Sequence, residues 1–97
     1  MANGKIDPLS AILHELRHHC EQSGAFWKAM CIEQSSTRKQ MFTDGWVSEN
    51  LKIATLCDLL RITAIPDEEM SKVISELETL KNSHGAIEAL LKDLRKS

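Results

Sequence analysis

The strongest signal in the sequence is a heptad repeat in the last third of the chain. Eight positions between residues 70 and 94 follow alternating spacings of three and four, and seven of them are apolar. These spacings match the a and d positions of a coiled coil. The set, which we call the C-terminal seam, is Met70, Val73, Leu77, Leu80, His84, Ile87, Leu91 and Leu94. Such a repeat predicts helical structure with one edge buried against other helices.

The seam crosses a stretch that forms helix poorly. Asn82, Ser83, His84 and Gly85 lie in its middle, and a glycine inside a helix costs about 1 kcal/mol relative to alanine. The segment is therefore either one straight helix over 67–95 or a helix that ends at Gly85 and folds back. The straight form would be about 44 Å long, whereas a compact domain of this size is about 32 Å across. Because the heptad phase continues through the interruption, we favour the straight helix, which must bury its seam on another chain.

Three more helices are predicted upstream of the seam. Asp7 and Pro8 form a typical helix start, and the apolar spacing that follows predicts a helix that ends near Gly24. A turn is expected around Gly45, followed by a core helix whose apolar side chains point in nearly every direction. Pro66 separates that helix from the last one. The predicted helices are 8–22, 25–41, 47–62 and 67–95.

The composition excludes most other fold classes. The chain has 97 residues, of which 42% are hydrophobic and 27% charged, as in an ordinary single globular domain. This balance excludes wholesale disorder, and with 4 Gly, 2 Pro and 4% aromatic residues the composition argues against a turn-rich sandwich or barrel. We therefore predict one all-α, four-helix domain over 1–97, with residues 1–6 as a flexible N-terminus and 67–95 as a self-association helix.

Charge and cysteine content restrict the partners and the compartment. A formal charge of −2, from 12 basic and 14 acidic residues, argues against a protein that holds nucleic acid through a positive field. No run of 18 apolar residues is present to cross a membrane, and residues 1–8 lack the apolar core of a secretion signal. We expect Cys20, Cys31 and Cys57 to be small apolar side chains buried in the core of a cytoplasmic protein, where thiols stay reduced. An intersubunit disulfide is the alternative.

These features favour a non-enzymatic protein–protein interaction module without a cofactor. We expect a regulator, adaptor or inhibitor that forms a homodimer through the C-terminal seam. Large side chains in the middle of the chain are candidate contacts for a protein partner of unknown identity, and core packing is their alternative role. They are Phe26, Trp27, Met30, Phe42 and Trp46. His84 is either a satisfied, partly buried histidine or a polar group that sets the register of the dimer.

A DNA-binding transcriptional regulator is the first alternative function. Residues 47–80 could form two helices joined by a short turn, as in helix-turn-helix proteins. The second of these helices would begin with Asp67, Glu68 and Glu69, and three carboxylates at that position repel phosphates. Nucleic acid is therefore not the expected partner.

A zinc-dependent peptidase is the second alternative. His14-Glu15-Leu16-Arg17-His18 resembles the H-E-x-x-H motif of zinc peptidases, in which the two histidines share the metal and the glutamate acts as base. The resemblance covers five residues, no strand precedes it, and no spacing selects a third ligand from Glu33 or Glu49. We expect no metal site, and His14 and His18 are the candidates if one exists.

Overall fold

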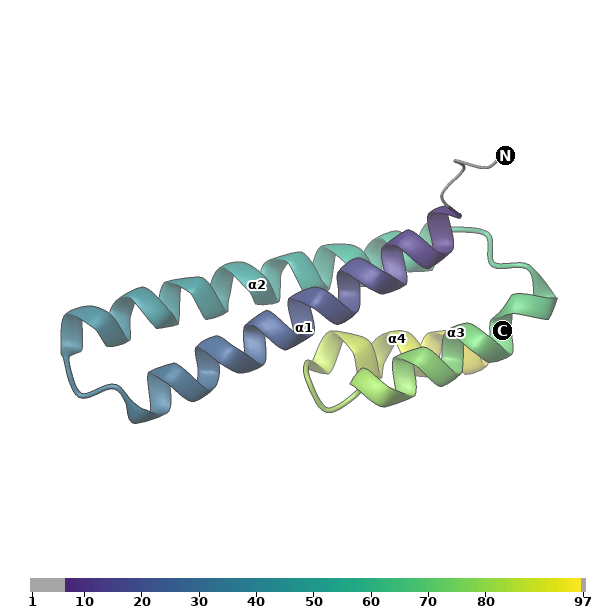
Figure 1. The fold of residues 1–97 in the computed structure, drawn as a ribbon. Coiled ribbons are helices and arrows are strands. Elements are labelled where there is room, and N and C mark those ends of the chain that lie inside the picture. Colours follow the sequence, from purple (N-terminus) through teal and green to yellow (C-terminus); the bar gives the residue numbers. More distant parts are fainter. Residues whose placement is uncertain (1–6, 97) are drawn as a thin grey trace.

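The chain folds into four helices in a computed structural model that describes residues 7–96 (Figure 1). The helices are α1 (Pro8–Ile32), α2 (Ser36–Ile62), α3 (Asp67–Leu80) and α4 (Gly85–Lys96). The described residues contain no strand, which confirms the predicted all-α, four-helix domain. The prediction that residues 1–6 form a flexible N-terminus lies outside the described residues.

The helices form two antiparallel hairpins of unequal length. α1 pairs with α2 along a long hairpin, and the shorter α3–α4 hairpin packs on the end where α1 begins and α2 ends (Figure 1). α2 has 27 residues and α3 has 14, which correspond to about 40 Å and about 21 Å. About two fifths of the long hairpin therefore projects beyond the short one. We call the four-helix part the body and the projecting part, residues 24–46, the arm.

The hydrophobic core lies in the body. Its members come from all four helices, and full burial of one such side chain stabilises the fold by about 1.5–3 kcal/mol. They are Leu9, Leu13, Leu16, Cys20, Ile53, Cys57, Leu60, Val73, Leu77, Ile87, Leu90 and Leu91. Within the described part of the chain, the arm contributes no residue to this core.

Local signals in the sequence set the helix starts. The Asp7 carboxylate accepts a hydrogen bond from the Leu9 backbone N–H at 3.2 Å, and Pro8 occupies the first turn of α1. The Ser35 hydroxyl accepts from the Arg38 backbone N–H at 3.4 Å at the start of α2. Both side chains satisfy backbone donors that have no partner inside the helix.

Two predicted helix breaks are wrong. α1 continues through Gly24, and α2 continues through Gly45. The chain instead reverses over residues 33–35, where Glu33 has extended backbone and Ser35 caps α2. A glycine costs a helix only about 1 kcal/mol, and the lateral packing of α1 on α2 offsets that amount.

The prediction that residues 47–62 form a helix enclosed on all sides is also wrong. Ile53, Cys57 and Leu60 are buried, but Leu51 is 65% exposed and Ile62 is 81% exposed. α2 packs closely against α1 and α4, but its backbone does not come close to α3. One side of α2 in the body therefore faces solvent.

The straight C-terminal helix is wrong as well, and the fold-back alternative is confirmed. α3 ends at Leu80, residues 81–84 form a turn, and α4 returns antiparallel from Gly85. Both halves of the seam thereby pack on the same α1–α2 surface. Four seam residues are buried in the body and the other four are partly buried: Val73, Leu77, Ile87 and Leu91, and Met70, Leu80, His84 and Leu94 respectively.

This burial removes the predicted dimer surface. A side chain that is already inside the body is not available to a second copy unless the body opens. His84 Nδ1 accepts a hydrogen bond from the Ala86 backbone N–H at 3.0 Å, so this histidine caps the start of α4 and is satisfied within its own chain. The homodimer stays a prediction, and four of the eight seam residues assigned to it are buried within the chain itself.

Candidate functional site

The pairing of α1 with α2 continues from the body into the arm with the same residue spacing. Three contacts between α1 and α2 fall at matched steps: Ser23 Oγ donates to Asn50 Oδ1 at 2.7 Å, the Trp27 and Trp46 rings lie 5.1 Å apart, and Thr43 Oγ1 donates to Met30 Sδ at 2.9 Å. Each step of four and then three along α1 is matched by an equal step back along α2. This is the spacing of an antiparallel coiled-coil pair.

The same spacing links these contacts to the core. We call the two sets of positions the heptad rows. On α1 the row is Leu9, Leu13, Leu16, Cys20, Ser23, Trp27 and Met30, and on α2 it is Thr43, Trp46, Asn50, Ile53, Cys57 and Leu60. Ser23 is 3% exposed and the next row position, Trp27, is 48% exposed. The row positions are therefore covered by α3 and α4 as far as the α3–α4 turn and are exposed beyond it.

A polar layer marks the junction of body and arm. Besides the Ser23–Asn50 hydrogen bond, His19 Nδ1 lies 2.9 Å from Glu49 Oε2, and Lys52 Nζ lies 3.4 Å from the same oxygen. Glu49 is only 8% exposed, and these two nitrogens compensate for the loss of water around it. Polar pairs inside an apolar row penalise shifted alignments, so this layer sets the register of α1 against α2.

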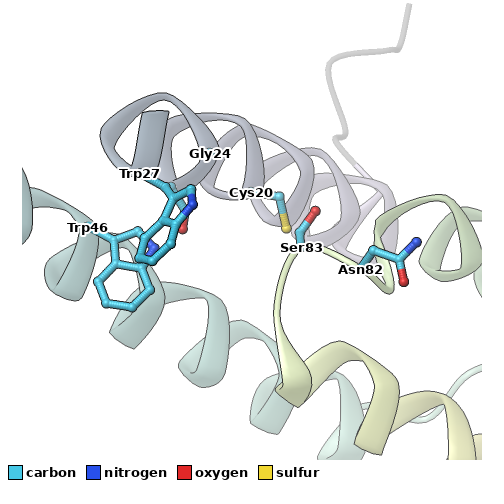
Figure 2. A pocket seen from close by; sticks show the side chains of 7 residues that line it. Cys20, Gly24, Trp27, Trp46, Asn82 and Ser83 are labelled. Atoms are coloured by element: carbon cyan, nitrogen blue, oxygen red, sulfur yellow. The ribbon is translucent and has the colours of Figure 1, made fainter. Parts of the chain in front are cut away.

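Beyond the polar layer, the Phe26 ring of α1 lies directly over Gly45 of α2. A Cβ at Gly45 would lie 2.7 Å from the Phe26 ring, a distance that no real side chain adopts. The adjacent indole rings of Trp27 and Trp46 are tilted by 44°. Figure 2 shows these two rings side by side, with Asn82 and Ser83 of the α3–α4 turn across from them.

A pocket of about 370 Å³ lies between the tryptophans and that turn (Figure 2). We call it the step, because the two-layer body gives way here to the one-layer arm. All of its lining residues are uncharged: Cys20, Ser23, Gly24, Trp27, Trp46, Asn82 and Ser83. Large aromatic surface with a few hydroxyl and amide groups is typical of sites that bind other molecules.

The cysteines divide into two buried thiols and one exposed thiol. Burial raises the pKa of Cys57 to about 11. Burial also raises the pKa of Cys20, an effect that a hydrogen bond with Ser83 partly opposes. Both thiols are therefore protonated at neutral pH and are poor nucleophiles. Cys31 is exposed, so the expectation that all three cysteines are buried is wrong for this one.

The histidines of the H-E-x-x-H motif lie on the outer face of α1. Both His14 and His18 are exposed, and His18 contacts the ring of His19, whose Nδ1 lies beside Glu49. Neither suggested third ligand is placed to help, because Glu49 is occupied by His19 and Glu33 lies at the far end of α1. Across residues 7–96, no group of three or more His, Cys, Asp or Glu side chains is arranged to hold a metal ion.

The helix-turn-helix interpretation does not match the packing. In that motif the two helices pack together across the turn, whereas the backbones of α2 and α3 do not come close to each other. α3 also begins with Asp67, Glu68 and Glu69, as the sequence indicated. None of the helices in the described part of the chain is both long enough and apolar enough to cross a bilayer.

Comparison with known proteins adds no assignment: no family model, no curated protein and no solved structure matches the chain.

The fold brings all five predicted partner-binding residues together on the arm. Phe26, Trp27 and Met30 come from α1, and Phe42 and Trp46 come from α2. The sequence interpretation missed the residues that complete the step, which are Cys20, Ser23, Gly24, Asn82 and Ser83. The heptad rows carry a signal for Cys20 and Ser23, because both continue the spacing from Leu16 to Trp27. No local signal places the α3–α4 turn beside them.

Proposed function

We propose that this chain is a non-enzymatic helical interaction module whose contact surface is the row-facing side of the arm, centred on Trp27 and the step. One observation carries the proposal. Trp27 occupies a heptad-row position whose counterparts in the body are buried, yet it is 48% exposed. A large aromatic side chain at such a position is stabilised when another helical surface covers it.

The apolar character of the arm supports the proposal. Ile32 at 81% and Met41 at 66% exposure add apolar side chains near the tip of the arm, on the sides of α1 and α2 that face away from the heptad rows. Among the large hydrophobic side chains of the arm, Trp27 is the exposed one on the row side, and a large exposed aromatic side chain is typical of interaction sites. The protein would act as a regulator, adaptor or inhibitor by engaging this surface. We place it in the cytoplasm, because its three cysteines are free thiols, as in a reducing compartment.

Site-specific crosslinking in the native host tests the proposal. A photoreactive phenylalanine analogue replaces Trp27, and in a control chain it replaces Ser71, an exposed residue of α3 in the body. We expect a discrete crosslinked product from position 27 and none from position 71, with the partner identified by mass spectrometry. Equal labelling from both positions, or none from position 27, would show that the arm is not an interaction surface.

A further inference from the structure

We infer that the step is a binding site for one neutral aromatic ring that carries a hydrogen-bond donor, as in a phenol. The inference rests on the proposed function, because it names the group that the protein partner places beside Trp27, a tyrosine side chain. Three features of the pocket carry it: the character of the lining, a buried hydroxyl within that lining, and the open space over Gly24.

The walls of the step suit a flat ring. The indoles of Trp27 and Trp46 form one wall, and Asn82 and Ser83 of the α3–α4 turn lie across from them (Figure 2). Aromatic rings pack on indoles in offset or edge-to-face contact and gain more than their buried area alone provides. An enclosed cavity of about 150 Å³ holds a benzene ring. The step, at about 370 Å³, therefore has room for a phenol and the carbon that joins it to a peptide chain.

The charge of the lining favours a neutral ring. An ionised group loses hydration when it enters a pocket, and an opposite charge or fixed hydrogen bonds must compensate for that loss. None of the seven residues that line the step is charged, and the Cys20 thiol stays protonated because burial raises its pKa. The step therefore discriminates against carboxylates and ammonium groups.

Ser23 determines the polarity of the ring. This residue is 3% exposed, and its Oγ donates its only hydrogen to Asn50 Oδ1 at 2.7 Å. A hydroxyl oxygen also has two lone pairs that accept, so towards the step Ser23 accepts and does not donate. The Asn82 amide across the pocket can do both and does not discriminate. A phenol O–H can donate to Ser23, whereas a ring without a donor leaves this acceptor unused.

Gly24 leaves space that a side chain would fill. It lies inside α1, where alanine is more favourable than glycine, yet a Cβ at this position would meet nothing within 4 Å. The packing of the chain on itself therefore does not require glycine here. Because Gly24 lines the step, a longer side chain at this position extends into the pocket and narrows it.

Titration of the isotope-labelled full chain with p-cresol, the side chain of tyrosine, tests the site by two-dimensional NMR. We expect saturable shifts of both indole N–H signals and of the Asn82 and Ser83 backbone amides, with a dissociation constant on the order of 1 mM for so small a ligand. Toluene, which has no donor, should bind about three- to tenfold more weakly. The negatively charged p-toluate should bind at least about tenfold more weakly.

Gly24→Leu is the variant that blocks the step. Its side chain enters open space, so the chain should stay folded by circular dichroism and bind p-cresol at least about tenfold more weakly. Ser71→Leu, at an exposed position of α3, is the matched control and should leave the dissociation constant unchanged. Ser23→Ala should lower the affinity for p-cresol to that for toluene. If Gly24→Leu does not fold, Gly24→Ala replaces it, with a smaller loss of affinity expected.

The possible results separate this inference from the proposed function. Absence of saturable shifts, equal binding of p-toluate, or full binding by the blocked variant overturns the ring site, while a crosslink from position 27 still supports the interaction module. Toluene binding equal to that of p-cresol overturns the requirement for a donor. Binding of p-cresol without any crosslink supports the ring site and overturns the protein interaction. N-acetyltyrosine amide should bind at least as well as p-cresol, and its failure to bind overturns a tyrosine side chain as the occupant.

Discussion

At the scale of the single residue, Gly24 and Gly45 differ in role although both are glycines inside the helices of the arm. Each lies inside a long helix, where glycine is normally destabilising because the unfolded chain has more freedom. A Cβ at Gly24 would meet nothing within 4 Å, whereas at Gly45 it would overlap the Phe26 ring. Gly24 is therefore replaceable, and Gly45 leaves the space that the Phe26 ring occupies.

The two glycines should respond to alanine with opposite signs. Gly24→Ala should raise the free energy of unfolding by about 0.5–1 kcal/mol through helix propensity alone. Gly45→Ala should lower it by about 1–3 kcal/mol, since the Phe26 ring must move. Urea unfolding followed by circular dichroism measures both. Equal stabilisation by the two substitutions would show that Phe26 does not restrict this position.

Cys57 should make the stability depend on pH in the alkaline range. Its pKa is about 11 in the folded chain against an ordinary value of 9.0, so the folded state holds the proton more tightly than the unfolded state. The contribution is fully present below pH 9 and is lost as pH rises from about 9 to 11. The loss should approach about 2 kcal/mol.

Urea unfolding at pH 8 and pH 10.5 measures this loss, with Cys57→Ala as the control. The variant should lose less stability between the two pH values than the wild type, although Cys20, whose pKa is also raised by burial, retains part of the effect. An identical pH dependence in both chains would rule out Cys57 as its source.

At the scale of the element, heptad spacing accounts for both a correct and an incorrect prediction. The heptad spacing of the seam identified its buried side correctly, but spacing does not state whether the covering helices belong to the same chain. In α1 and α2 the spacing also runs unbroken through Gly24 and Gly45. Helix breaks were predicted there because glycine was weighted above the period. The period was the better guide, because two long helices packed along their length tolerate one weak residue each.

Leu77→Ala tests the conclusion that the seam is internal. Leu77 is fully buried in the body, so the substitution should lower the free energy of unfolding by about 2–5 kcal/mol. It should leave the crosslink from position 27 unchanged, because Leu77 lies in α3, outside the arm. Leu51→Ala, at an exposed position of α2, should have little effect on either quantity. A Leu77→Ala chain of normal stability and altered mass would restore the seam as an interface.

At the scale of the whole molecule, stability and interaction are assigned to different parts. The body contains the whole described core and the ion pairs that join the helices, such as Arg61 to Asp93 at 2.9 Å between α2 and α4. The arm has paired helices and exposed aromatic surface but no core of its own. A surface that is not needed for folding is free to bind, and this separation is expected of an interaction module.

Removal of one heptad from each helix of the arm tests this separation. Deletion of residues 24–30 and 40–46 keeps both rows in phase and keeps the loop at 33–35, while it removes both tryptophans. Because the core lies outside the deleted residues, the shortened chain should retain its helicity and a cooperative thermal transition. Loss of the cooperative transition would show that the arm is required for folding.

Local chemistry along the chain determined the fold class, the helix start at Asp7, and the buried sides of α3 and α4, because capping and apolar periodicity act over one or two turns. The tertiary structure decided that the last segment folds back and that the α3–α4 turn stops beside Cys20, which leaves Trp27 uncovered. Both outcomes depend on the relative lengths of the two hairpins. The α1–α2 hairpin is about 40 Å long, and the α3–α4 hairpin, about half as long, covers only part of it. These lengths belong to segments that are far apart in the sequence, so the residue spacing within either segment does not predict how they match.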